Sequence, residues 1–556
     1  MTRGDEHSEI GVPSPPSAYL RSASTVPDDR LPPSFERICV DPEVKTLAGS
    51  TSPAVLLGGS PLKLLRLNPP ADAIFAALAR GVTLHDAAVE SNRSVRSVAR
   101  FTRRLLDSGI VHPRWERRAE ELDDQPIQLS RSVSIIIPVY QRSAELDRLL
   151  TSIHESLPTG IPVIVVDDGS TDDSSAVALG HGARVVRHET SRGPAAARNA
   201  GLEGVATEFV AFLDSDCLVT GRWLEPLMAH FGDPAVALVA PRIAGLAPRM
   251  GRSANLEHTS MRAYEDVRSP LDLGNREAPV VPRTRVAYVP AAALVARTAA
   301  IRDIGGFATS MHVGEDVDLL WRLHAAGHVC RYEPSSVVQH DHRTSPGAFL
   351  KRRFQYGTSA AELAKRHPGH VPPLAVSGWS ALAWGLLATV NLLGLAASAA
   401  VVVGTAAALP QKLTSVAEPR KLAARLALRG HLGAGRQLAS AIWRSYLPIA
   451  IACALLSKRA RFTLLAAGLI PNLLDWSERH PNLDPIRYVG IRLADDAAYC
   501  AGVWHGCREG STLAPLRPDL TSWPGRRNAA EDSIGSGGGN RRKIASWLST
   551  STARWK

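Results

Sequence analysis

The stretch EFVAFLDSDC, residues 208–217, joins an apolar run to two carboxylates that stand directly at its end. The apolar part predicts a buried β-strand. Asp214 and Asp216 occupy positions i and i+2, which point to opposite sides of an extended strand, so a turn must re-aim them. Once re-aimed, such carboxylates can hold Mg²⁺ or Mn²⁺ together with the oxygens of a diphosphate. A solvated acidic turn is the alternative for a pair of this kind on its own.

The chain around this stretch, from residue 131 to about 345, alternates strand and helix patterns. The runs VSIIIPVY (133–140) and PVIVVDD (162–168) begin with continuous apolar residues, which is typical of strands covered on both faces. A helical pattern separates each strand from the next. This βαβαβ order predicts an α/β domain with a parallel sheet and right-handed crossovers. Ligands of such sheets bind beyond the carboxyl ends of the strands.

Two further motifs stand where strands should reach the same sheet edge. Asp167 and Asp168 close a strand and precede a glycine turn, so a carboxylate there could accept an N–H from a planar base. Gly193 opens a helix whose N-terminus would attract an anion, with Arg198 one turn inside it. The alternatives are an Asx turn that caps the next helix and a plain surface helix.

Together the three motifs resemble those of the family 2 glycosyltransferases of the GT-A fold, over residues 133 to about 345. The resemblance implies a Rossmann-like mixed sheet that binds a nucleotide-diphosphate sugar. Asp167 or Asp168 would then bind the nucleobase, and Asp216 would bind the metal ion. The full set predicted to bind the nucleotide sugar is Pro138, Tyr140, Asp167, Asp168, Gly193, Arg198 and Asp214.

The stretch MHVGEDVDLLWRLH, residues 311–324, resembles the acceptor motif of the same family. Glu315 and Asp316 follow a glycine and begin a helix, and one of them should take the proton from the attacking hydroxyl. General-base help of this kind is typically worth about 10²–10⁴-fold. We favour Asp316, because the second acid of the pair is the base in the family. The alternative is that both acids only complement the helix dipole.

His340 matches a histidine that serves as an additional metal ligand in related transferases, and His342 is its rival. Arg343, Arg352 and Arg353 could neutralise the leaving diphosphate. No QxxRW motif follows the acidic pair, which favours the addition of single or few sugars over processive synthesis. Because no nucleophilic carboxylate is needed, we expect in-line displacement with inversion.

Residues 37–115 form a separate unit of strand patterns followed by short helix patterns. This order predicts a winged helix, and it resembles the small PqqD-like domain that recognises peptides for peptide-modifying enzymes. A DNA-binding winged helix is the alternative, which the arginines between residues 96 and 104 keep open, although we predict no nucleic acid partner. We expect disorder in residues 1–36 and, as a basic tail, in residues 508–556.

Residues 346–507 predict an apolar helical region, and the segment 374–409 within it carries no charge. About 20 apolar residues span a bilayer, so one or two passes fit this segment. Basic residues flank both sides, which favours an even number of passes or a re-entrant hairpin. With a formal net charge of +11, the pattern predicts association with the cytoplasmic face of the cell membrane. The alternative is a buried helical layer of a soluble domain.

The order of a PqqD-like unit, a family 2 transferase and an apolar C-terminal region resembles the glycosyltransferases of mycofactocin biosynthesis. The resemblance implies transfer of glucose from UDP-glucose onto a small peptide-derived acceptor, with an oligoglucose chain as the product. Two alternatives remain open. One is a family 2 transferase that acts on a cell-wall or lipid acceptor, and the other is a non-catalytic, membrane-tethered recognition protein.

Overall fold

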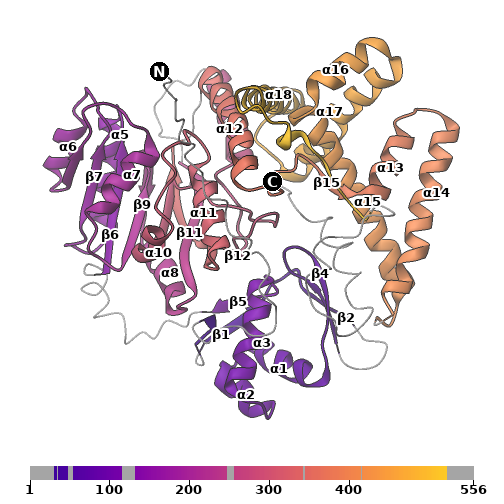
Figure 1. Cartoon of the computed structure of the whole chain (residues 1–556), viewed down its shortest axis with the longest axis horizontal. Helices are drawn as coiled ribbons and strands as arrows, with labels where there is room; N and C mark the ends of the chain where they lie inside the picture. The colour runs from indigo at the N-terminus through magenta and orange to yellow at the C-terminus, as the bar shows by residue number, and fades with distance from the viewer. Residues whose placement is uncertain are drawn as a thin grey trace, which may run out of the picture.

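The structure is a computed structural model of the chain, and it describes residues 30–33, 36–47, 54–114, 132–246, 256–341, 345–414 and 416–522. The leader predicted for residues 1–36 therefore lies largely outside the described residues, as does the tail beyond residue 522. Figure 1 shows three parts: a sheet flanked by helices, a small N-terminal unit below it in the view, and a helical C-terminal region beside it.

One half of the central sheet is parallel, as the βαβαβ pattern predicts. Its strands lie in the order β9-β6-β7-β8 and pair in parallel. They are β6 (Val133–Val139), β7 (Val163–Asp167), β8 (Arg184–Arg187) and β9 (Phe209–Leu213). The carboxyl ends of parallel strands meet at one edge of a sheet, so the acids that follow β7 and β9 come to the same edge.

The other half of the sheet mixes strand directions. β13 (Ala293–Arg297) pairs antiparallel with β9 and with β11 (Val236–Gly245), and β11 pairs in parallel with β14 (Val329–His340). β10 (Cys217–Val219) and β12 (Ala278–Pro279) both pair antiparallel with β14. The described residues thus form a nine-stranded mixed sheet, which confirms the predicted α/β fold class.

Helices cover both faces of the sheet (Figure 1), because alternate side chains of each strand point to opposite sides. In β6, Ile135 belongs to the core beneath α5 (Ser143–Ser156), whereas Ile136 belongs to the core on the other face. There α7 (Pro194–Glu203) approaches closely at Gly201, where a Cβ atom would lie 2.6 Å from Cγ2 of Ile136. This close approach holds α7 against the sheet, with its N-terminus at the edge where the parallel strands end.

The N-terminal unit consists, within the described residues 36–114, of two small sheets and three helices. β1 (Arg37–Val40) pairs with β5 (Val111–Arg114), and the other sheet comprises β2 (Lys45–Leu47), β3 (Val55–Gly58) and β4 (Lys63–Arg66). The helices are α1 (Pro69–Ala79), α2 (Leu84–Glu90) and α3 (Val95–Asp107). A buried ion pair between Arg103 of α3 and Asp233 fixes the unit to the sheet domain.

The C-terminal region is helical, as the sequence predicts. Its helices are α12 (Pro346–Arg366), α13 (Gly378–Leu387), α14 (Leu392–Ala408), α15 (Pro419–Arg444), α16 (Leu447–Leu456), α17 (Lys458–Arg479) and α18 (Pro485–Glu509). α12 and α18 touch through glycines. A Cβ atom at Gly357 would lie 2.2 Å from the carbonyl oxygen of Tyr499, so only glycine allows this approach.

The end of the described chain differs from the prediction of a disordered tail. α18 continues to Glu509, and β16 (Asp519–Thr521) pairs in parallel with β15 (Ala375–Ser377). Leu520 packs against the small apolar core beneath β15. The prediction is wrong for residues 508–522, because a short strand held by backbone hydrogen bonds needs no apolar periodicity in the sequence.

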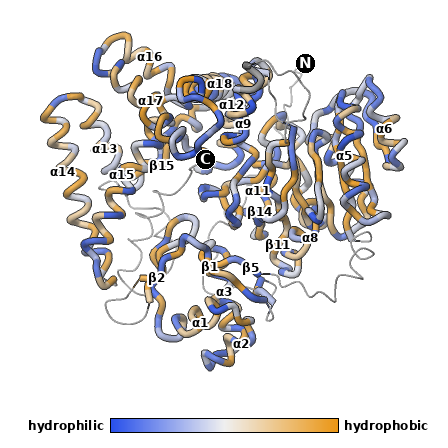
Figure 2. The backbone as a smooth tube through the Cα atoms, turned by 180° about the vertical axis from the view of Figure 1, so that it is seen from behind, coloured by the Kyte–Doolittle hydropathy of each residue, from blue (hydrophilic) through white to orange (hydrophobic). Residues whose placement is uncertain are grey.

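Among the described residues, one helix is long and apolar enough to cross a membrane, the continuous segment Leu392–Lys412 that begins with α14. α15 and α16 would add a second if they were one span, although they are bent by 91°. Figure 2 shows hydrophobic residues concentrated along α14 and α16, at the end of the molecule far from the parallel strands.

Candidate active site

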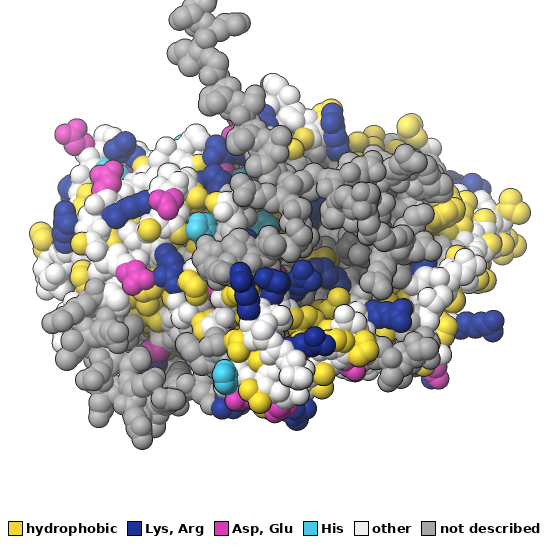
Figure 3. Space-filling model, turned by 60° about the horizontal axis from the view of Figure 1, so that its bottom comes forward, with side chains coloured by type: hydrophobic (Ala, Val, Ile, Leu, Met, Phe, Trp, Pro, Cys, Tyr) yellow, Lys and Arg dark blue, Asp and Glu magenta, His cyan; other side chains and the backbone are white. Residues whose placement is uncertain are grey.

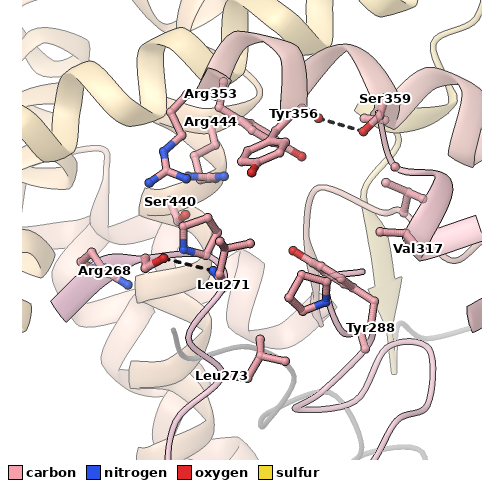
Figure 4. A pocket seen from close by; sticks show the side chains of 18 of the residues that line it. Arg268, Leu271, Leu273, Tyr288, Val317, Arg353, Tyr356, Ser359, Ser440 and Arg444 are labelled. Atoms are coloured by element: carbon pink, nitrogen blue, oxygen red, sulfur yellow. Dashed lines mark hydrogen bonds between the residues drawn. The ribbon is translucent and has the colours of Figure 1, made fainter. Parts of the chain in front are cut away.

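A large cavity opens at the sheet edge beyond β9 and β14, between the sheet domain and the C-terminal helices. Its volume is about 1840 Å³. Figure 4 shows part of its lining, with Tyr288 and Tyr356 pointing into the same space. Of the residues predicted to form a site, its wall contains Arg198, Asp214, Asp216, Glu315, Asp316 and His340. Residues from several separate motifs therefore meet in one cavity.

The turn between β9 and β10 aims both acids of the DSD motif. The N–H of Asp214 donates to the carbonyl of Ala292 at 2.9 Å, and the N–H of Cys217 donates to the carbonyl of Asp214 at 3.0 Å. β10 then begins at Cys217, which pairs with His340 of β14. This pairing brings His340 beside Asp216, with Nε2 of the histidine 3.3 Å from Oδ1 of the acid.

Asp216 is held ionised by its contacts with Arg142 and His340. Burial raises the pKa of its carboxyl, but His340 and Arg142 outweigh burial, so the pKa lies well below its usual range. The Nη1 atom of Arg142 donates to Oδ2 of Asp216 at 2.6 Å. Burial lowers the pKa of His340, and Asp216 raises it by more. The ion pair with Asp216 therefore favours the protonated form of the His340 imidazole.

The two acids of the turn and His340 of β14 together offer the ligand atoms that the predicted metal ion requires. Asp214 and Asp216 offer carboxylate oxygens, and His340 offers an imidazole nitrogen, a combination that suits Mn²⁺ and, through its oxygens, Mg²⁺. The Asp214 side chain is 31% exposed, so a ligand in the cavity can reach it. An ion bound here would replace the proton of His340, because only the neutral imidazole coordinates a metal.

A different group in the described part of the chain brings three potential ligands closest together. The ligating atoms of His230, Glu277 and Glu333 lie within 4.8 Å of one another. However, His230 already bonds Glu333 at 2.9 Å, and Glu277 forms an ion pair with Arg331. The group also lies outside the cavity wall, so it plays no part in the candidate active site.

Arg198 links the DSD motif to the acidic pair at the start of α11 (Glu315–Ala325). Its Nη2 atom donates to Oδ1 of Asp214 at 2.7 Å, and its Nη1 atom donates to Oε1 of Glu315 at 2.9 Å. Burial lowers the pKa of Arg198, but Asp214 and Glu315 raise it by more, so the guanidinium stays charged. Glu315 is thus neutralised by a fixed partner.

Asp316 has no cationic partner among the described residues. Its carboxylate accepts hydrogen bonds from the N–H of Val317 at 2.8 Å and the N–H of Ala291 at 3.4 Å. Burial and the neighbouring Glu315 raise the pKa of Asp316 to about 6. Asp316 can therefore take up a proton near neutral pH.

The acids at the end of β7 are engaged within the protein. Asp167 is fully buried and accepts from Arg187 at 2.9 Å, while Asp168 accepts from His188 at 2.6 Å and from the N–H of Gly193 at 2.8 Å. These bonds tie β7 to β8 and to the start of α7. The predicted nucleotide-sugar residues that lie outside the cavity wall are Pro138, Tyr140, Asp167, Asp168 and Gly193.

The arginines expected to neutralise a diphosphate have different environments. Arg353 is buried and forms ion pairs with two acids, so its charge is already matched. Arg352 lines the cavity, lies 4.7 Å from the ring centroid of Tyr356, and has no acidic partner in the described part of the chain. Outside the described residues lie Arg343 and His342.

Sequence reasoning misses Arg142, the second cationic neighbour of Asp216. It stands in the loop between β6 and α5, where no motif marks it. The signal that could have identified it is its position just beyond a strand that ends at the same sheet edge. Pro61 of the N-terminal unit is likewise unexpected in the cavity wall, because nothing in the sequence predicts how the two domains pack.

Comparison with known proteins gives two matching family profiles. "Glycosyl transferase family 2" matches residues 134–272, and "Glycosyl transferase family group 2" matches residues 209–470. The pre-mycofactocin glycosyltransferase of Mycobacterium tuberculosis is 41% identical over 501 residues, which cover 88% of this chain and 99% of that protein. Glycosyltransferase AglE of Haloferax volcanii is 26% identical, and the alignment covers 40% of this chain and 71% of AglE.

Two solved structures also align with parts of the chain. The mannosyltransferase of Pyrobaculum calidifontis in complex with GDP-Man and Mn²⁺ shares 19% identity, covers 53% of this chain and 86% of its own, and gives a TM-score of 0.33. TarS of S. aureus shares 18% identity, covers 68% of this chain and 92% of its own, and gives a TM-score of 0.31. At these scores the likeness is partial.

Proposed function

The chain belongs to the family 2 glycosyltransferases, and we propose that it transfers glucose from UDP-glucose, with inversion, onto a small peptide-derived acceptor. The family is shown by its profile and by a relative that is 41% identical over 99% of that relative's length. That relative is a pre-mycofactocin glycosyltransferase, so the chain is a transferase of the mycofactocin type. The alternative of a non-catalytic recognition protein is wrong.

The observation that carries the proposal is the unequal state of the two acids at the start of α11. Glu315 is paired with Arg198, whereas Asp316 faces the cavity with no ion-pair partner among the described residues and has a pKa raised to about 6. A general base works best when its pKa lies near the working pH. This asymmetry supports Asp316 as the base that activates the acceptor hydroxyl, with Glu315 in a positioning role.

A single displacement fits these residues. The acceptor hydroxyl loses its proton to the Asp316 carboxylate while its oxygen forms a bond to the anomeric carbon of the sugar. The bond between that carbon and the diphosphate oxygen breaks, and the diphosphate leaves with the electron pair. A single displacement of this kind inverts the configuration at the anomeric carbon, and in it Asp214, Asp216 and Glu315, each paired with an arginine, need form no bond to the sugar.

The cavity also contains the groups needed to bind a diphosphate. Asp214, Asp216 and His340 would hold Mg²⁺ or Mn²⁺, which when bound neutralises negative charge on the donor. Arg352 adds a cation without an acidic partner in the described part of the chain. Its position over the Tyr356 ring orders the guanidinium, so it can bind an anion that enters the cavity.

The contacts of the N-terminal unit support a peptide-derived acceptor. Pro61, in the turn between β3 and β4, is part of the cavity wall. Its neighbour Ser60 accepts a hydrogen bond from the N–H of Arg285 at 2.9 Å, and Arg276 forms an ion pair of 2.9 Å with Asp41. A PqqD-like unit that holds a peptide would therefore present it at the rim of the catalytic cavity.

The proposal is tested by incubating the full-length protein with UDP- and GDP-sugars, Mg²⁺ or Mn²⁺, and either peptide-derived or lipid acceptors. Mass spectrometry should show a hexose added to the small polar acceptor, with UDP-glucose as the preferred donor and no product after chelation of the metal. Sugar found in the lipid extract instead would favour the lipid-acceptor alternative. Retention of the anomeric configuration in the product would exclude the single displacement.

A further inference from the structure

Two helical hairpins of the C-terminal region expose large apolar side chains at their ends. One hairpin joins α13 to α14, and the other joins α16 to α17. At the first end Leu392 and Leu393 are 85% and 84% exposed, and at the second Leu455 and Leu456 are 79% and 90% exposed. Contiguous apolar surface of this kind marks an interaction site on a folded protein.

The two hairpin ends lie side by side. The hydroxyl of Thr463 in α17 donates to the carbonyl of Ala388 at the end of α13, at 3.5 Å. Figures 1 and 2 show both ends at the corner of the molecule opposite the parallel strands, and Figure 3 shows hydrophobic side chains at the end where α14 lies. We name this joint area the hairpin-end surface; it comprises Leu387, Val390, Leu392, Leu393, Leu455, Leu456 and Phe462.

Positive charge borders the hairpin-end surface. Lys458, Arg459 and Arg461, at the start of α17, are exposed and have no ion-pair partner in the described part of the chain. Between residues 374 and 474 the sequence contains a single acid, Glu418. The basic side chains beside the leucines are therefore not balanced by acids of the same region.

We propose that the hairpin-end surface docks on an anionic lipid bilayer, with its leucines among the acyl chains and its basic residues on the headgroup phosphates. Exposed apolar residues combined with clustered Lys and Arg are the features that bind anionic membranes. A second copy of the chain would bring the same unbalanced positive charge to the contact, which disfavours self-association through this surface.

The lengths and contacts of the helices indicate entry into one leaflet. α16 has 10 residues and is therefore about 15 Å long, half of the roughly 30 Å hydrocarbon core. α14 stays packed on the protein, because Thr405 bonds His431 of α15 at 2.8 Å and Trp384 of α13 donates to the His431 carbonyl at 2.7 Å. The hairpins therefore dip into the bilayer and return without crossing it.

Docking in this way would place the catalytic cavity beside the membrane. In α17, Ala467 and Pro471 line the cavity, whereas Leu469 and Ile470 are exposed. One helix thus has one side on the cavity and another side towards solvent near the hairpin-end surface. Membrane-bound enzyme would therefore keep its catalytic cavity close to the bilayer surface.

Flotation of the full-length protein with lipid vesicles tests the proposal. The protein should float with vesicles that contain phosphatidylglycerol and should remain unbound with phosphatidylcholine alone. The charge-neutralising variant K458Q/R459Q/R461Q should bind the anionic vesicles about a hundredfold less tightly, because each basic residue near the surface adds to the attraction. The variant L455S/L456S should also lose binding.

A matched control replaces leucines away from the hairpin ends. Leu428 and Leu432 of α15 are each 55% exposed, and L428S/L432S should float like the wild type. Unchanged flotation of K458Q/R459Q/R461Q, which alters only exposed charges, would overturn the proposal. So would a dimer that L455S/L456S abolishes in the absence of lipid, or wild-type protein that resists alkaline extraction from vesicles as a spanning helix does.

Discussion

Two pairs of adjacent acids stand at one edge of the sheet domain, and they have opposite environments. Asp167 and Asp168, after β7, are buried and each accepts several hydrogen bonds from within the protein. At the start of α11, Glu315 pairs with Arg198, whereas Asp316 has no ion pair within the described residues. The first pair organises loops, and the second leaves one carboxylate with a raised pKa in a cavity wall. Asp316, the proposed general base, differs from the other three acids in having no ion-pair partner in the described part of the chain.

The substitution Asp316→Asn should have the largest effect that this comparison predicts. The amide keeps the shape of the side chain but cannot take up a proton, so kcat for glycosyl transfer should fall by about 10²–10⁴-fold. The melting temperature should change little, because no ion pair is lost. Steady-state kinetics and thermal unfolding measure both. Full activity in this variant would mean that the base lies elsewhere.

Asp168→Asn should lower stability and leave kcat almost unchanged, the reverse of what is expected for Asp316→Asn. Asp168 accepts from Ser191, from His188 and from the N–H of Gly193, and an amide cannot accept from all of these donors. The free energy of unfolding should fall by about 1–3 kcal/mol in chemical denaturation, as for buried donors left without an acceptor. The kcat of the folded fraction should stay within a few-fold of wild type. A large rise in the KM for the nucleotide sugar with unchanged stability would instead favour direct binding of the base.

The pH dependence of kcat separates the roles of Glu315 and Asp316. Asp316 must be deprotonated to act, so kcat should rise with pH through about 6, its pKa in the folded protein. Glu315 raises that pKa by charge repulsion, so Glu315→Gln should move the acidic limb of the profile to lower pH. The control is Asp168→Asn, which should leave the limb where it is. An acidic limb that stays in place in Glu315→Gln would contradict the contribution of Glu315 to the raised pKa of Asp316.

The smallest predicted effect is on acid stability. Burial raises the pKa of Asp168, but hydrogen bonds from Arg192, His188 and Ser191 outweigh burial and lower it from 3.8. A carboxyl with a lowered pKa stabilises the fold above its ordinary pKa, and this stabilisation is lost as the pH falls towards the folded value. Asp168→Asn should therefore show a shallower loss of stability below about pH 4. Parallel unfolding curves for the two proteins would contradict this.

The sequence predicts the strand ends well, because apolar runs followed by acids identify buried strands without knowledge of the fold. It therefore predicts that Asp214, Asp216 and the pair at the start of α11 serve one site, and the structure brings them into one cavity. Through the family resemblance, the sequence also predicts that His340 lies with Asp216, as the structure shows. The pairing of β10 with β14 gives the physical reason.

The sequence could not show which acids are already satisfied. Apart from the nearby Ser170 and Ser175, the donors to Asp167 and Asp168 lie at the end of β8 and in the loop before α7, which only tertiary contacts bring close. The same holds for Arg198, whose bridge to Glu315 joins residues far apart in the chain. Domain packing, which brings Pro61 into the cavity wall, has no local signal at all.

A titration of the carboxyl groups themselves tests most directly whether Asp316 can serve as the general base. NMR of protein with ¹³C-labelled aspartate, with Asp316→Asn and Asp168→Asn used to assign the two signals, gives each pKa in the intact chain. Asp316 should titrate near pH 6, whereas Asp168 should stay ionised to below its ordinary pKa of 3.8. An Asp316 that titrates at or below the ordinary aspartate value would contradict the assignment of this residue as the general base.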